Sequence, residues 1–169
     1  MWNCHENLTR AAALIPEGVD AALITSEVSR QYLLHFPSTA GYLLLTREHA
    51  VFLVDSRYTE KAQKTFTGCE IVLLTSFSKQ LREYFTAWKI KTLAVESSDM
   101  TMREYNRLQK VFPEIEVLRS NHFDSGLLNM RRIKSADEIC RMKEAQKITD
   151  EAFRKICEFI SVGVSEKGI

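Results

Sequence analysis

Residues 41–55 read GYLLLTREHAVFLVD and contain two short apolar runs separated by three polar residues. Each run has the length of a β-strand, and both are rich in aliphatic and aromatic side chains. The connection at 47–49 is short enough for a hairpin. We therefore expect antiparallel strands at 41–46 and 50–54, and the rest of the fold can be assigned outward from this pair.

On either side of the hairpin, short apolar runs alternate with amphipathic segments, a pattern typical of α/β proteins. Ser26 and Thr101 are the expected N-caps of two helices, the second with Glu104 in a capping box. The sequence predicts a mixed sheet of about six strands, mostly parallel outside the hairpin, with helices on both faces. Further strands are expected at 20–25, 70–74, 92–96 and 115–118. Helices are expected at 7–15, 26–33, 55–66, 78–88 and 101–111.

The pattern changes after Gly126, where a basic stretch, MRRIK at 130–134, follows. Ser135 and Glu138 form a second capping box. It opens a long amphipathic helix expected to reach about Val162. The functional interpretation of this helix is a connector or a dimer face. The alternative is that it packs on its own domain.

The composition narrows the classes of function. The chain has 169 residues, of which 45% are hydrophobic and 27% charged, and this is typical of a globular protein with about one domain. We expect a domain at 1–128 and a linker with the long helix at 129–169. The 23 basic and 22 acidic residues are interleaved, which argues against a nucleic-acid partner. No apolar run approaches the length of a membrane span, and the first residues lack a secretory-signal pattern.

Motifs for common cofactors and nucleophiles are missing from the sequence. The six glycines form neither a dinucleotide-binding nor a P-loop pattern. There is no H-E-x-x-H or G-x-S-x-G motif, and Cys4-His5-Glu6 is expected to be an incidental polar end. The four cysteines are widely spaced, which favours unpaired, structural thiols in a reducing cytoplasm.

Two stretches are candidate functional segments. Asp55, Ser56, Arg57 and Tyr58 lie where a strand ends and a helix begins, a place near which ligands often bind in α/β proteins. The structural alternative is that Asp55 or Ser56 caps the helix and Arg57 pairs with a carboxylate.

The second candidate is the loop His35, Phe36, Pro37, Ser38 and Thr39 before the hairpin. Its histidine, aromatic ring and rigid proline could contact a ligand or a partner. The alternative is a structural lead-in to the hairpin, with Phe36 inside the core.

Taken together, several stretches resemble the N-terminal domain of the creatinase, prolidase and aminopeptidase P family. The MRRIKSADEI segment at 130–139 resembles the junction at which these enzymes pass into their catalytic domain, and GVSE at 163–166 the turn after that domain's first helix. Family members usually carry NRxYL[ST]GF where this chain has SRQYLLHF at 29–36, so His35 stands in place of a glycine. The other matching stretches are AALITSE at 21–27, AGYLL at 40–44 and FLVDSRYTEKA at 52–62.

The resemblance implies a ribonuclease H-like α/β domain of a cytoplasmic, homodimeric hydrolase that cleaves short peptides before proline. The parent enzymes hold two divalent metal ions (Mn, Co or Zn) on two aspartates, a histidine and two glutamates of the C-terminal domain. None of those positions exists in this chain, so we assign it no catalytic residue, metal ligand or cofactor.

The expected partners are the chain's own catalytic domain and a second subunit. In family dimers the N-terminal domain helps to wall the active site of the partner, and here the rim would be the loop from His35 to Thr39. One alternative is a stand-alone binding module that keeps the fold without catalysis. Another is a small enzyme that uses a cysteine or carboxylates.

Overall fold

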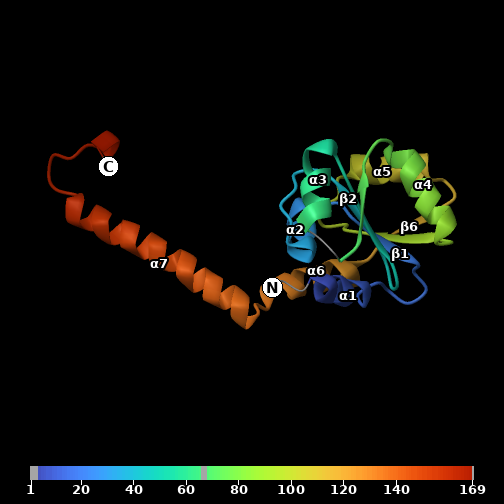
Figure 1. Ribbon diagram of the computed structural model, residues 1–169, viewed down its shortest axis with the longest axis horizontal. Helices are drawn as coiled ribbons and strands as arrows, with labels where there is room; N and C mark the ends of the chain where they lie inside the picture. The colour runs from blue at the N-terminus through green and yellow to red at the C-terminus, as the bar shows by residue number, and fades with distance from the viewer. Residues whose placement is uncertain (1–3, 66–67, 169) are drawn as a thin grey trace. The chain divides into compact units, whose positions relative to one another are not determined.

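The computed structural model describes residues 4–65 and 68–168 (Figure 1). The side chains of Cys4 and His5 also lie outside the described part. The chain divides into two compact units, Met1–Arg131 and Arg132–Ile169. The first is an α/β unit and the second contains one long helix.

The α/β unit is built on a six-stranded sheet with the order β4-β3-β2-β1-β5-β6. β2 pairs antiparallel with both β1 and β3, while the β1–β5, β3–β4 and β5–β6 pairs are parallel. The expected hairpin and the mixed six-stranded sheet are therefore confirmed. The strands are β1 Ala21–Ile24, β2 Tyr42–Thr46, β3 Ala50–Val54, β4 Glu70–Leu73, β5 Thr92–Val95 and β6 Glu116–Arg119.

Helices cover both faces of this sheet, as expected, and each face has its own apolar cluster. Ala22 and Ile24 of β1 face one cluster, whereas Ala21 and Leu23 face the other. All four are fully buried, which explains why the strand is a continuous apolar run. On the first face lie α1 Cys4–Ala12, α2 Glu27–Leu34, α3 Ser56–Thr65 and α6 Asn121–Arg132; on the second lie α4 Phe77–Ala87 and α5 Met102–Val111.

The expected N-caps are present. The Ser26 side chain accepts a hydrogen bond from the Ser29 amide at the start of α2. Thr101 and Glu104 form a reciprocal capping box at α5. These polar side chains satisfy amide groups that the first helical turn leaves without partners, and they fix where each helix begins.

Two side-chain carboxylates connect β1 and β5 by hydrogen bonds, one at each end of the strand pair. At one end, Asp20 Oδ2 accepts from the amides of Lys91 at 2.8 Å and Thr92 at 2.9 Å. At the other, the buried Glu96 accepts through Oε2 from the amides of Thr25 at 2.8 Å and Ser26 at 2.9 Å. Hydrogen bonds from Lys91 and Thr92 lower the pKa of Asp20. These two sets of hydrogen bonds hold β1 in register with β5.

Helix α6 was not expected from the sequence, and the expected boundary at 128 falls inside it. Gly126 lies in the middle of the helix, where an added Cβ would come within 2.7 Å of the Leu14 side chain. The glycine therefore permits α6 to pack closely against the Leu14 side chain. Phe123, Leu127 and Met130 form its buried side. The expected end of α3 at Phe66 lies outside the described residues.

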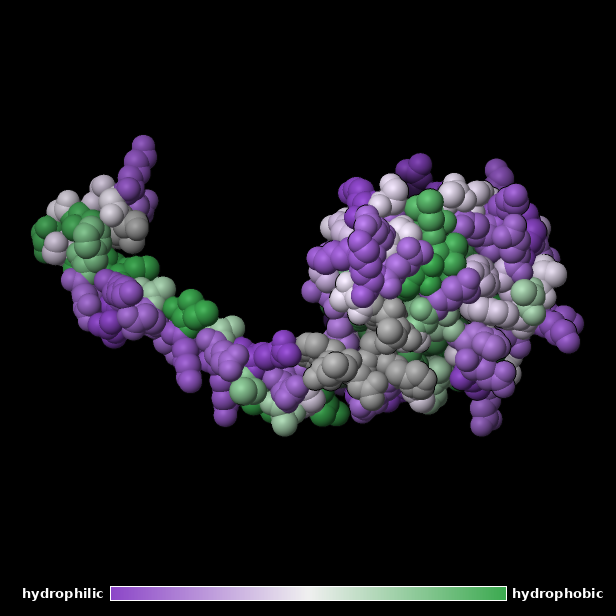
Figure 2. Space-filling view, in the orientation of Figure 1, coloured by the Kyte–Doolittle hydropathy of each residue, from purple (hydrophilic) through white to green (hydrophobic). Residues whose placement is uncertain are grey.

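The second unit contains α7, Ala136–Phe159, which starts with the expected capping box of Ser135 and Glu138. Glu151 pairs with Lys155 at 3.5 Å and with Arg154 at 2.7 Å. No residue of this helix is buried. Apolar side chains lie along it among charged ones (Figure 2). Within the described residues, none of the helices combines the length and apolarity needed to cross a membrane.

The entry to β2 generates a stability prediction. Gly41 has φ +133°, and a Cβ there would lie 2.7 Å from the Phe52 ring and 2.9 Å from the Leu53 carbonyl oxygen. We expect Gly41→Ala to lower the free energy of unfolding by about 2–4 kcal/mol, from backbone strain and overpacking. Gly18 is the matched control, since it also has a positive φ, +76°, but open space around it.

Urea unfolding of both variants, followed by circular dichroism, measures the difference. Gly18→Ala should cost only about 1–2 kcal/mol, the penalty for a left-handed alanine. Equal losses for the two variants would contradict the tight packing at Gly41.

Candidate functional site

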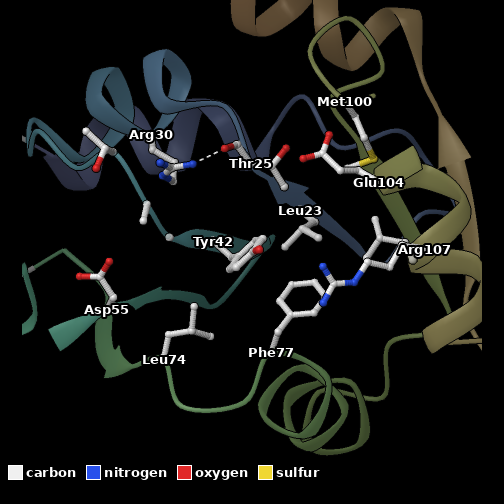
Figure 3. A pocket seen from close by; sticks show the side chains of 14 residues that line it. Leu23, Thr25, Arg30, Tyr42, Asp55, Leu74, Phe77, Met100, Glu104 and Arg107 are labelled. Carbon is white, nitrogen blue, oxygen red and sulfur yellow. Dashed lines mark hydrogen bonds between the residues drawn. The ribbon is translucent and has the colours of Figure 1, made fainter. Parts of the chain in front are cut away.

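A cavity of about 360 Å³ opens at the edge of the sheet where β1, β3 and β4 end and β2 begins (Figure 3). We call it the edge cavity. It lies at the carboxyl ends of the parallel strands, where open α/β sheets commonly bind ligands. Its polar lining residues are Thr25, Arg30, Thr39, Asp55, Glu104 and Arg107. Its larger apolar lining residues are Leu23, Tyr42, Leu74, Phe77, Met100 and Leu108.

The stretch from Asp55 to Tyr58 has a structural role that its geometry explains. Asp55 Oδ1 accepts from the Arg57 amide at 3.0 Å, so the side chain caps α3. The Arg57 guanidinium lies 2.6 Å from Asp55 Oδ2, and this contact lowers the pKa of the carboxyl group. Ser56 is the first residue of the helix. Asp55 also borders the edge cavity, with its charge already paired.

The loop at 35–39 is divided between the core and the surface. Phe36 is 3% exposed and packs edge-on against Phe52 and Tyr58, so it lies in the core rather than at a rim. Ser38 is also buried. Pro37 and Thr39 are exposed, and Thr39 Oγ1 lies 3.1 Å from the Tyr58 hydroxyl.

His35 ends α2 in the left-handed conformation, with φ 47° and ψ 30°. A glycine adopts this conformation without steric cost, and it is the residue that the family pattern carries here. The His35 Nε2 atom lies 3.1 Å from the side-chain amide of Asn7. With histidine in place of the glycine of the family pattern, the backbone still makes the same turn. The histidine ring lies against Asn7 of α1.

Arg30 is a site residue that the sequence reasoning did not single out. It is 2% exposed. Its guanidinium donates to the Thr25 carbonyl oxygen and, at 3.1 Å, to the Ser38 carbonyl oxygen. Its buried Nε has no hydrogen-bond partner within the part of the chain that the structure describes. Burial lowers the pKa of Arg30, while the charge of Glu96 opposes that shift. The sequence held two signals: Arg30 matches the arginine of the family pattern at 29–36, and it lies on a short helix that must pack on a sheet.

The edge cavity presents guanidinium, carboxylate and apolar groups to a ligand. It contains neither a histidine nor a cysteine to serve as a base or nucleophile. Glu104 accepts from the amide and hydroxyl of Thr101 in the capping box, so it is already engaged. What the cavity offers is an apolar middle between two guanidinium groups, those of Arg30 and Arg107 (Figure 3).

The described residues do not provide a metal site. No group of three or more histidine, cysteine, aspartate or glutamate side chains among them converges on a point that could hold an ion. Cys4 and His5 of the terminal trio lie outside that set. Cys69 is an unreactive thiol, because burial raises its pKa to about 12.

Comparison with known proteins identifies the family of this chain. A family model described as the creatinase/prolidase N-terminal domain matches residues 11–131, most of the chain. The chain belongs to this family. It is 33% identical over 150 residues to an uncharacterised peptidase of Bacillus subtilis, covering 88% of this chain and 42% of that protein.

Solved structures agree with this assignment. An Xaa-Pro dipeptidase from Bacillus anthracis superimposes with a TM-score of 0.86 at 34% identity, covering 97% of this chain and 46% of that one. An Xaa-Pro aminopeptidase from Streptococcus thermophilus gives a TM-score of 0.67 at 26% identity, covering 73% of this chain and 97% of that one. The present domain thus spans less than half the length of the Bacillus proteins, and the rest of those proteins, including the catalytic domain, has no counterpart in it.

The cysteines of this creatinase/prolidase N-terminal domain give a prediction about reactivity. With a pKa of about 12, Cys69 holds about one part in ten thousand of thiolate at pH 8. Cys140 and Cys157 are exposed on α7. We expect iodoacetamide at pH 8 to alkylate these two and to leave Cys69 unmodified until the protein is unfolded.

Peptide mass spectrometry after timed alkylation measures each site, with Cys140 as the internal control. Alkylation of Cys69 at the rate of Cys140 in the folded protein would show an activated thiol, and would favour the small-enzyme interpretation of the sequence.

Proposed function

We propose that this chain is the non-catalytic N-terminal domain, with its linker helix, of a metal-dependent peptidase that cleaves peptide bonds preceding proline. The observation that carries the proposal is the match to 42–46% of the length of the relatives, which leaves their catalytic domain uncovered. The parent would act in the cytoplasm. The free thiols of Cys69, Cys140 and Cys157 are consistent with a reducing compartment.

In this proposal the segment at 129–169 contains the linker and the first helix of the catalytic domain. Support comes from α7, whose Ile139, Met142 and Phe153 side chains are each at least 43% exposed. A helix with a one-sided apolar stripe needs a covering surface to bury it. The missing catalytic domain would provide that cover.

The α/β unit would support dimerisation and narrow the active site of a second subunit. The exposed Pro37 and Thr39, which are anchored through buried Phe36 and through Tyr58, form the part of the loop able to contact that partner. Short peptides containing proline would be the substrates of the parent. These residues would contribute shape and would leave the chemistry to the other domain.

Two divalent metal ions, Mn, Co or Zn, would serve the parent by lowering the pKa of a bound water. The described residues of this chain do not fit such a site, because no cluster of ligands converges in them. The metal pair would therefore be held by the catalytic domain alone.

The alternative is a stand-alone binding module with the same fold. The edge cavity favours it, because a pocket with an apolar middle and a few polar groups is what such a module would use. The mass of the native protein separates the two functions. An immunoblot of source cells against this chain should show a band far above 19.5 kDa for the peptidase, and a band at 19.5 kDa would favour the module.

Activity provides a second test. We expect the chain alone to release no proline from Ala-Pro and to retain no stoichiometric metal after incubation with Mn²⁺ and dialysis. Joined to the catalytic half of the Bacillus anthracis relative, it should support hydrolysis. Proline release by ninhydrin and elemental analysis measure these outcomes, and tightly held metal in the isolated chain would contradict the proposal.

The same fusion tests the rim. Thr39→Trp should raise KM for a dipeptide several-fold with a smaller change in kcat, because it alters the wall and leaves the reacting groups in place. Thr86→Trp, on the exposed side of α4, is the matched control and should change neither value. Equal behaviour of the two variants would remove the loop from the active-site wall.

A further inference from the structure

Arg30 is a buried charge of the α/β unit that has no opposite charge next to it among the described residues. Buried charged groups are normally paired with an opposite charge, because desolvation is costly. Arg30 is 2% exposed, yet its two hydrogen bonds go to neutral carbonyl oxygens, and no carboxylate lies within salt-bridge distance among the described residues. Glu96 and Glu27 attract it only from farther away. Arg47 also donates to carbonyl oxygens alone, but its side chain is exposed.

A second guanidinium borders the same cavity. Arg107 of α5 lines the edge cavity and makes no hydrogen bond or ion pair with the described residues. Figure 3 shows it across the cavity from Arg30, with Leu23 and Tyr42 between them. Of the two acidic lining residues, Asp55 is already paired with Arg57, whereas Glu104 is hydrogen-bonded only to the neutral Thr101 and keeps its charge. Two guanidinium groups therefore face one free carboxylate, and the lining keeps an excess of positive charge.

The remaining lining sets the kind of molecule that would fit. Leu23, Tyr42, Leu74 and Phe77 form an apolar middle. At about 360 Å³ the cavity falls in the range of small-molecule sites. A guanidinium group recognises a planar carboxylate through paired hydrogen bonds. An apolar body attached to a carboxylate would match both features.

We propose that the edge cavity is a binding site for a small carboxylate ligand with an apolar body. This chemistry is shared by a free aliphatic acid and by the carboxyl end of a short peptide. The ligand's carboxylate lies toward Arg30, and its apolar part extends along Leu23, Tyr42 and Phe77 toward the side of Arg107. The site belongs to the α/β unit, and it holds whether or not the chain is part of a peptidase.

Direct titration of the ¹⁵N-labelled chain tests this site by NMR. The probes are hexanoate, and N-acetyl-Ala-Leu as its free acid and as its carboxamide. We expect saturable shifts of the amides at 39–42 and 100–108 with an acid, and at least tenfold weaker binding of the carboxamide. Tighter binding of hexanoate would identify a free acid as the natural ligand, and tighter binding of the peptide acid would identify a peptide end.

Variants separate the two arginines. Arg107→Gln should weaken acid binding about three- to fivefold, because it removes an exposed positive charge from the opposite wall of the cavity. Arg103→Gln is the control, because Arg103 is exposed on the same helix but does not line the cavity. Arg30→Gln should abolish the preference for acid over carboxamide. The wild-type and Arg107 comparisons stand even if this buried substitution prevents folding.

Three results would overturn the proposal: no saturable shift at millimolar ligand, equal affinity for acid and carboxamide, or shifts confined to another surface. The first would also indicate that water alone serves the unpartnered Nε of Arg30. None of them bears on the peptidase assignment, which the native mass and the fusion test separately.

Discussion

The parallel pairing of β1 with β5 joins the two halves of the sheet. At each end of this pair, a side-chain carboxylate accepts hydrogen bonds from backbone amides. β2, β3 and β4 lie on one side of this joint, and β6 lies on the other. Asp20 binds the amides that begin β5, and Glu96 binds those that follow β1. Because backbone amides are strong donors that must find partners, these two side chains help to fix the register of β1 against β5.

The same joint shapes the edge cavity. The Thr25 amide donates to Glu96, while the Thr25 carbonyl oxygen accepts from Arg30. A buried anion and a buried cation thus bind one residue from two sides without touching each other. Each charge is stabilised through the backbone, and the guanidinium remains at the wall of the cavity with capacity for a further acceptor.

Much of this architecture could be predicted from the sequence, because it rests on local signals. The hairpin, the N-caps at Ser26 and Thr101 and the long helix after Ser135 follow from short patterns of apolar and capping residues. The sequence does not predict helix α6, because a glycine such as Gly126 usually ends a helix. In the structure, Gly126 instead leaves room for the Leu14 side chain. The burial of Arg30 depends on how α2 packs on the sheet, and nothing in the neighbouring residues encodes it. The sequence predicts a loop after α2, but only tertiary packing decides that Phe36 faces inward.

The hydrogen bonds that Asp20 and Glu96 make at the ends of the β1–β5 pair connect distant parts of the chain. Glu96, for example, accepts from the amide of Thr25, 71 residues away. Contacts of such long range form late, because a large loop must close before they do. The β2–β3 hairpin is local and can form while the chain is still being synthesised. The centre of the sheet closes only after β5 has left the ribosome, so until then β1 lacks its parallel partner, and α1 and α2 cover only the face that carries Ala22 and Ile24.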